Sequence, residues 1–195
     1  MTYETKNFEN LNGTPGFSEA LLKNHFSLYE GYVTNTNKII ENLNNLLKEN
    51  KGSTPEYAEL KRRLGWEWNG MRLHEFYFEN ISKVPMEIDQ ESAIYKKITK
   101  EFESFENWKN DFKNTATMRG IGWAILYYDQ EAKKLFNAWI NEHDKGNFSG
   151  ADPILVIDIF EHAYMPDYGI KKADYIETAL KIINWQVLEK RFCKH

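Results

Sequence analysis

The sequence is poorest in cysteine. Its 195 residues include a single one, Cys193, close to the carboxyl end. One thiol cannot form a disulfide within the chain, so the small disulfide-stapled secreted scaffolds are excluded and a reducing compartment is favoured. We expect no function for Cys193 itself.

Long apolar runs and basic patches are also missing. No stretch of about 18 apolar residues occurs, so no membrane span is predicted. Residues 1–7 lack the basic start and apolar core of a secretory signal, which favours a cytoplasmic protein. The formal net charge is −4, and no basic stripe with interleaved aromatic residues is present. We therefore expect neither a nucleic-acid partner nor a membrane partner.

The chain is instead rich in groups that build a core. Hydrophobic residues make up 42% of it and aromatic residues 15%, which indicates a folded globular protein and not a disordered one.

Two long amphipathic helices are predicted in the first half of the chain. Ser18 is a favoured N-cap for the first helix, and Thr54-Pro55 starts the second after a break at residues 51–53. A short break between two such helices indicates an antiparallel hairpin. Each helix carries one histidine on its apolar stripe, His25 and His74, so both side chains are expected to face the seam.

The second half changes character after Pro85. Two shorter helices are expected, from about Asp89 and from about Ser104. Strands are expected at residues 123–128, 134–140 and 154–157, the first two forming a hairpin, and a last helix at residues 175–185. Because helices cluster before strands, the fold class is α+β. We expect a helical hairpin domain over residues 1–84 and a domain over residues 85–195 with a three-stranded antiparallel sheet and flanking helices.

The third expected strand ends in an unusual way. Four apolar residues, Ile154 to Ile157, lead directly into Asp158, and His162 follows four residues later. Charged groups at the end of a buried strand must be paired, hydrogen-bonded or bound to a metal. The alternative is an aspartate that caps the next helix and a histidine that packs in the core.

Four donors on separate elements thus form a candidate set: His25, His74, Asp158 and His162. Three imidazoles and one carboxylate suit a redox-active transition metal such as iron or manganese better than a closed structural site. We expect the metal to lie between the two domains.

Several segments carry a family resemblance. The stretch Asp158-Ile-Phe-Glu-His-Ala-Tyr164 resembles the signature D-x-W-E-H-A-Y of iron/manganese superoxide dismutases, with Phe160 in the place of tryptophan. Four other segments are similar to motifs of that family: His25–Val33, Met71–Phe78, Gly120–Trp123 and Asn184–Trp185.

The resemblance implies a function. It implies that His25, His74, Asp158 and His162 bind one iron or manganese ion per chain, and that the protein disproportionates superoxide to oxygen and hydrogen peroxide. It also implies that Tyr32 stands beside the substrate channel.

The resemblance also implies an assembly, a homodimer or a homotetramer. Glu161 would cross the interface to the ligand His162 of the other chain, which suits a ligand histidine that needs its second nitrogen held by a carboxylate. Tyr29, Tyr164 and Trp123 are expected around the ligands or at this interface.

This chain departs from the family pattern at three places. His25 and Tyr32 lie seven residues apart, one fewer than is usual, so that Asn24 takes the expected ligand position. Tyr29 stands where the family has a gateway histidine. Gly70 offers no side chain where one branch of the family has a glutamine near the metal-bound solvent. In the loop after the second strand, His143 is the substitute candidate, and a histidine there is expected to titrate near neutral pH.

Two other readings follow from the residues. A di-iron carboxylate bundle needs Glu-x-x-His pairs, and the chain contains none. A dimeric metal-binding or interaction protein of the same fold without dismutase activity stays open. Three cations near the ligands or the last strand, Arg72, Lys171 and Lys172, are candidates for attracting an anionic substrate.

Overall fold

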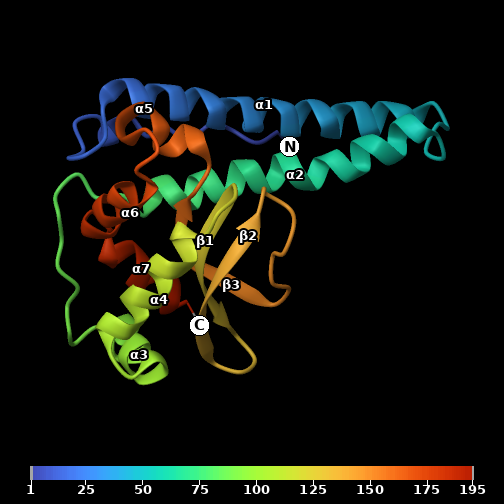
Figure 1. Ribbon diagram of the computed structural model, residues 1–195. Helices are drawn as coiled ribbons and strands as arrows, with labels where there is room; N and C mark the ends of the chain where they lie inside the picture. The colour runs from blue at the N-terminus through green and yellow to red at the C-terminus, as the bar shows by residue number, and fades with distance from the viewer. Residues whose placement is uncertain (1, 195) are drawn as a thin grey trace.

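The computed structural model describes residues 2–194, and its first two long helices form a hairpin. Helices α1 (Glu19–Lys48) and α2 (Pro55–Glu79) run antiparallel along one side of the molecule (Figure 1). The predicted cap at Ser18 and the predicted helix start at Thr54-Pro55 are confirmed. The side chains of Ser18 and Thr54 accept hydrogen bonds from the first turns of their helices. A short 3-10 turn, η1 (Glu9–Leu11), precedes the hairpin.

The sheet has three antiparallel strands in the order β2-β1-β3. Their bounds are β1 (Gly122–Asp129), β2 (Lys134–Asn141) and β3 (Ala151–Asp158). The central strand β1 is buried along seven of its eight residues, as its run of apolar and aromatic side chains requires. The predicted α+β class and three-stranded antiparallel sheet are confirmed.

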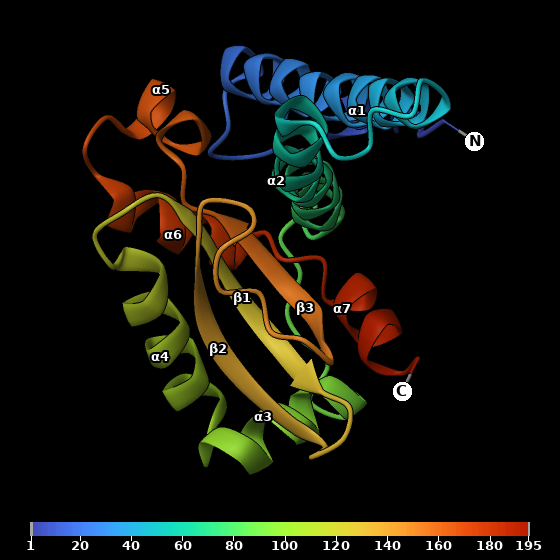
Figure 2. The ribbon, with the colours of Figure 1, turned by 90° about the vertical axis from the view of Figure 1, so that its right-hand side faces the viewer.

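Helices surround the sheet, and the hairpin lies across one end of it (Figure 2). Helices α3 (Ala93–Phe102) and α4 (Phe105–Thr117) pack on β2, and α4 also packs on β1. After β3 come η2 (Glu161–Ala163), α5 (Met165–Tyr168), α6 (Lys172–Lys181) and α7 (Trp185–Phe192). Within residues 2–194, no helix is both long enough and apolar enough to cross a membrane.

The single last helix predicted over residues 175–185 is wrong, because the structure divides this region into α6 and α7. Ile183 leaves the helix to form a β-bridge with Ile81, and the Asn184 amide donates to the Asn80 carbonyl at 2.7 Å. The Asn184 side chain then caps α7 by accepting from the Val187 amide. Pairing with a distant segment thus overrides the local helical pattern.

The end of α2 is fastened to β3 by two buried polar side chains. The side-chain amide of Asn80 donates to the Val156 carbonyl at 2.6 Å, and the guanidinium of Arg191 in α7 donates to the Ile154 carbonyl at 2.8 Å. Arg191 also donates to the Asn80 side-chain oxygen. These bonds hold β3 at the end of the hairpin, which brings the end of β3 toward the two histidine-bearing helices.

At Gly122, strands β1 and β2 approach so closely that no side chain fits. Its φ is +145°, and a Cβ there would lie 1.9 Å from the carbonyl oxygen of Ile140. We expect Gly122→Ala to destabilise the fold by about 2–4 kcal/mol, since overpacking and backbone strain each cost about 1–3 kcal/mol. At this chain length that corresponds to a melting temperature lower by roughly 5–10 °C, measured by thermal unfolding.

Gly31→Ala is the control, because Gly31 is helical and its Cβ would meet nothing within 4 Å. This variant should unfold at the wild-type temperature or higher, by up to about 1 kcal/mol of stability. Equal effects at the two glycines would contradict the assigned approach of β1 and β2.

Candidate metal centre

Four donor side chains meet where the hairpin, β3 and η2 come together. His25 comes from α1, His74 from α2, Asp158 from the end of β3, and His162 from η2. One ligand atom from each lies within 4.8 Å of all the others, and within residues 2–194 this is the one such group of histidine, cysteine or acidic residues. The structure therefore brings together all four candidates selected from the sequence.

All three imidazoles converge on one carboxylate oxygen. The distances from Asp158 Oδ2 are 3.1 Å to His25 Nε2, 3.2 Å to His162 Nε2 and 3.5 Å to His74 Nε2. His25, His74 and Asp158 are completely buried, and the His162 side chain is 26% exposed. Of the four candidate ligands, His162 is thus the one with solvent exposure.

The tautomer of His74 shows that these residues fit a cation. Its Nδ1 lies 2.6 Å from the Gly70 carbonyl oxygen, which can only accept, so the proton is on Nδ1. The Nε2 lone pair then faces the Asp158 carboxylate, and this buried nitrogen has no hydrogen-bond partner among the described residues. A lone pair aimed at an anion is unfavourable unless a cation lies between them, as a metal ion would.

The protonation states agree with this donor set. Burial, above all, lowers the pKa of His25 and lowers that of His74 strongly, so both are neutral near pH 7. Burial alone would raise the pKa of Asp158, but His162 and His25 outweigh it and hold that pKa well below its usual value. Burial lowers the pKa of His162, but Asp158 outweighs burial and holds that pKa above its usual value. Because neutral imidazoles and an ionised carboxylate are the forms that bind metal, a proton on His162 has to leave when an ion binds.

His25 and not Asn24 faces the centre. Helix α1 is regular over its whole length, and Asn24 is exposed on its outer side. Seven residues make nearly two full helical turns, so His25 and Tyr32 lie on the same face without any irregularity. The spacing that distinguishes this chain from the family therefore preserves the placement of both side chains.

Tyr32, His143 and Trp123 form a hydrogen-bonded chain next to the ligands. The Trp123 indole donates to His143 Nδ1 at 3.1 Å, which leaves the proton on Nε2, 2.8 Å from the Tyr32 hydroxyl oxygen. The loop after β2 that carries His143 is held in place, because the Asn147 side chain donates to the His143 carbonyl at 3.0 Å. Burial lowers the pKa of His143 to about 4, so the expectation that a histidine here titrates near neutral pH is wrong.

Gly70 explains why no glutamine is found on α2. A Cβ at this position would lie 2.6 Å from Cδ1 of the Tyr32 ring. The ring occupies that space and stacks on His74, with centroids 5.1 Å apart and an interplanar angle of 29°.

Phe160 fills the position of the family's tryptophan by stacking. Its ring lies between His143 at 4.8 Å and His162 at 5.4 Å, nearly parallel to both. Trp123 packs edge-on against His74 at 5.1 Å. These rings form an apolar wall around the candidate ligands.

Tyr29 is buried and hydrogen-bonded to groups other than the ligands. Its hydroxyl accepts from the Lys6 amide at 3.0 Å and donates to Glu75 at 3.1 Å. Arg72 also binds Glu75, at 2.7 Å. Tyr29 and Arg72 therefore both bind the carboxylate of Glu75, which is not one of the candidate ligands.

Of the two other predicted cations, Lys172 donates to the Met118 carbonyl, and Lys171 is exposed at the start of α6. Among the predicted interface residues, Glu161 is exposed beside His162. Tyr164 is nearly buried and stacks on Tyr175, with centroids 5.7 Å apart.

Sequence reasoning missed Trp66 and Arg63. Trp66 packs against His143 at 4.5 Å and Tyr32 at 5.5 Å, and Arg63 lies over its ring. A signal for Trp66 existed, because it precedes Gly70 and His74 by steps of four residues on α2 and so shares their face.

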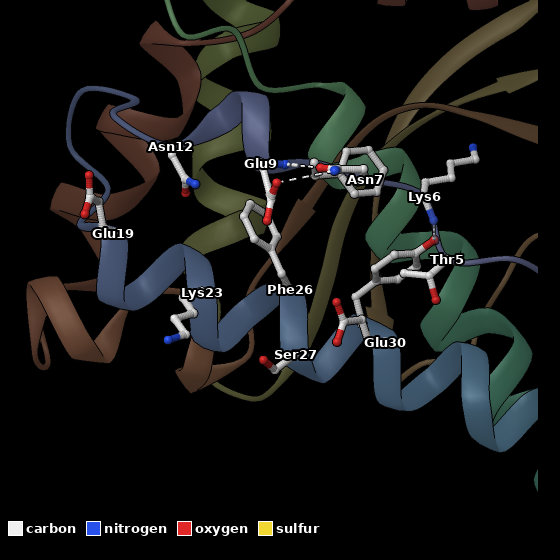
Figure 3. A pocket seen from close by; sticks show the side chains of 12 residues that line it. Thr5, Lys6, Asn7, Glu9, Asn12, Glu19, Lys23, Phe26, Ser27 and Glu30 are labelled. Atoms are coloured by element: carbon white, nitrogen blue, oxygen red, sulfur yellow. Dashed lines mark hydrogen bonds between the residues drawn. The ribbon is translucent and has the colours of Figure 1, made fainter.

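A separate pocket of about 460 Å³ lies between the N-terminal segment and α1 (Figure 3). Its lining includes Lys6, Asn7, Glu9, Lys23 and Glu30, with no histidine or cysteine. It does not provide a donor set comparable with the four-residue group.

The comparisons with known proteins agree with this geometry. Residues 90–191 match the sequence model of the iron/manganese superoxide dismutases, C-terminal domain. The chain is 32% identical over 181 residues to the superoxide dismutase [Mn] 2 of Haloferax volcanii, covering 91% of this chain and 88% of that protein. It is 32% identical over 186 residues to the superoxide dismutase [Fe] of Saccharolobus solfataricus, covering 93% and 88%.

A third relative, the superoxide dismutase [Fe] of Aquifex pyrophilus, is 35% identical over 184 residues, covering 92% of this chain and 85% of that protein. Matches of this extent, together with three histidines and an aspartate that converge as the sequence resemblance implied, show that the chain belongs to the iron/manganese superoxide dismutase family.

Proposed function

We propose that the protein disproportionates superoxide to oxygen and hydrogen peroxide at one iron or manganese ion held by His25, His74, Asp158 and His162. The observation that carries this proposal is the convergence of three imidazole nitrogens on one buried carboxylate oxygen, within 4.8 Å of one another. Relatives named for manganese and for iron are 32% and 32–35% identical to the chain, so either metal is a candidate.

An iron or manganese ion held by these four residues would supply the one-electron redox chemistry that disproportionation of superoxide needs. The protein has other tasks. Asp158 contributes a negative charge that partly offsets the charge of the ion. The ring wall of Trp123 and Phe160 limits water around the centre, which strengthens every electrostatic interaction inside it.

Tyr32 is placed to offer a proton to substrate. Burial in the first place, and the charge of Asp158 in the second, raise the pKa of Tyr32, so the phenol keeps its proton. His143 has one N–H to give, because its Nδ1 accepts from Trp123, and that N–H donates to the Tyr32 oxygen. The O–H of Tyr32 is then left to point toward an incoming oxygen atom. We propose that His143 acts mainly through Tyr32.

The decisive experiment is metal analysis combined with superoxide turnover after reconstitution with iron and with manganese. Wild type should bind about one ion per chain and turn over superoxide with at least one of the two metals. Asp158→Asn should lose metal affinity by more than the roughly 10–100-fold that outer-shell changes cost. His143→Gln is the matched control and should keep the metal.

Two results would count against the proposal. Metal bound without turnover would favour the alternative, a metal-binding or interaction protein of the same fold. Binding of metal by Asp158→Asn at wild-type affinity would contradict the assignment of Asp158 as a metal ligand.

The lowered pKa of His143 gives a pH prediction. Because this group ionises only near pH 4, it stays neutral as pH rises from there, and replacing it with glutamine removes no ionisation near neutrality. We expect the pH profiles of kcat/KM for wild type and His143→Gln to run parallel between roughly pH 5.5 and 8. A limb of the profile in that window that disappears in His143→Gln would contradict the burial effect.

We further propose a homodimer in which Glu161 of each chain binds the partner's His162. Among the bonds of residues 2–194, His162 uses only Nε2, and a ligand histidine normally has a partner for its other nitrogen. Ile121 and Met165 are both more than 40% exposed near this site, as a face covered by a second copy requires. Ile121 adjoins Gly122, whose carbonyl accepts from the Ile159 amide at 2.8 Å.

We expect Glu161→Ala to shift the protein toward monomer in sedimentation at micromolar concentration and to weaken metal retention about 10–100-fold in competition with a chelator. Glu91→Ala removes one exposed acid elsewhere and should change neither quantity. A wild type that sediments as a monomer would end this part of the proposal.

A further inference from the structure

A cation on α2 is stacked on Trp66, the ring that packs against Tyr32 and His143. The guanidinium carbon of Arg63 is 3.8 Å from the centroid of the Trp66 ring. That ring in turn lies 4.5 Å from His143 and 5.5 Å from Tyr32. Trp66 is thus the wall between a surface cation and the residues beside the candidate metal centre.

Trp66 is held in this position from the other side as well. Its indole N–H donates to Glu142 Oε2 at 3.2 Å, and Lys145 binds the other oxygen of Glu142 at 2.8 Å. Because Glu142 precedes His143 in the same tight loop, the positions of the tryptophan and the histidine are linked.

Arg63 keeps free hydrogen-bond donors on its solvent side. Its Nε and one terminal nitrogen both lie 2.9 Å from Glu67 Oε1. The Glu67 side chain is 5% exposed and that of Arg63 is 47% exposed, so the carboxylate lies beneath and the guanidinium faces water. Arginine carries five N–H groups, and those not bound to Glu67 are available to an anion from solution.

The charge of Arg63 acts at Tyr32. Burial, Asp158 and Glu67 raise the pKa of Tyr32, and Arg63 is the group that lowers it. The contacts through Trp66 keep Arg63 within the Debye length of about 10 Å at 0.1 M salt, so its charge is only partly screened there. Arg72, one of the cations expected from the sequence, instead donates to the buried Glu75.

We propose that Arg63 captures the anionic substrate at the mouth of the centre and that the Trp66 face guides it to Tyr32. This inference rests on the proposed function, since it names superoxide as the anion. It assigns the local positive potential to a residue of α2 and not to Arg72, Lys171 or Lys172.

The first test needs no turnover. Iodide, an anionic quencher, and acrylamide, a neutral one, are titrated against the tryptophan fluorescence of the metal-loaded protein at constant ionic strength of about 0.1 M. Each measurement is repeated in a Trp66→Phe background, so that the difference reports on Trp66. Arg63→Gln should lower iodide quenching of Trp66 about twofold and leave acrylamide quenching unchanged.

Arg62→Gln is the matched control, because Arg62 is the neighbouring residue, is 74% exposed and pairs with Glu59. It removes the same charge and should leave both quenchers unchanged. Arg63→Lys should restore most of the iodide effect.

The second test is kcat/KM for superoxide as a function of ionic strength. Arg63→Gln should lower it about two- to fourfold at low salt, leave kcat unchanged, and converge with wild type at high salt. Arg62→Gln should follow wild type.

The two tests distinguish a failure of the Arg63 proposal from a failure of the proposed function. Equal iodide quenching in Arg63→Gln and Arg62→Gln overturns the role of Arg63. A parallel loss with acrylamide also overturns it, because Arg63 would then only hold Trp66 in place. If wild type does not turn over superoxide, the proposed function fails while the iodide result still decides whether Arg63 gathers anions.

Discussion

The structure depends on one buried charge, the carboxylate of Asp158. It has no exposure to solvent, and removing an ion from water costs several kcal/mol unless partners compensate. His25 and His162, from two other elements, compensate part of that cost at a single oxygen, and a metal ion between this oxygen and His74 would compensate the rest. The hairpin, the sheet and the segment after β3 therefore have to meet at this point, and the bonds of Asn80 and Arg191 hold β3 in place there.

The departures of this chain from the family sequence pattern are related to one another in the structure. Gly70 leaves room for the Tyr32 ring, and Tyr32 then meets His143 where a longer side chain on α2 would otherwise reach. A histidine offers one N–H where a glutamine offers two, so the donor must serve one acceptor at a time. Tyr29 donates to Glu75 and not to Tyr32 or His143, so the hydrogen-bond network here differs from the usual family arrangement.

Periodicity and motifs predicted much of this, for physical reasons that apply locally. The apolar stripes placed His25 and His74 inward, and the acid that ends a buried strand marked Asp158. The break between α6 and α7 could not be predicted, because it depends on pairing with Ile81 and Asn80 about 100 residues away. The pKa of His143 was mistaken for the same reason, since its burial is created by rings from distant segments. Arg63 gave no signal, because a stacked arginine and a solvated one look alike in sequence.

The position of Arg191 has a consequence for how the protein matures. This buried residue lies in α7, the last helix described, yet it fastens β3 to α2, and His25 and Asp158 are themselves 133 residues apart. During synthesis the amino-terminal part of a chain emerges and organises first. The hairpin can form before α7 has emerged from the ribosome, but β3 then lacks the bonds of Arg191. The centre is therefore completed only once α7 has been synthesised and has packed on β3.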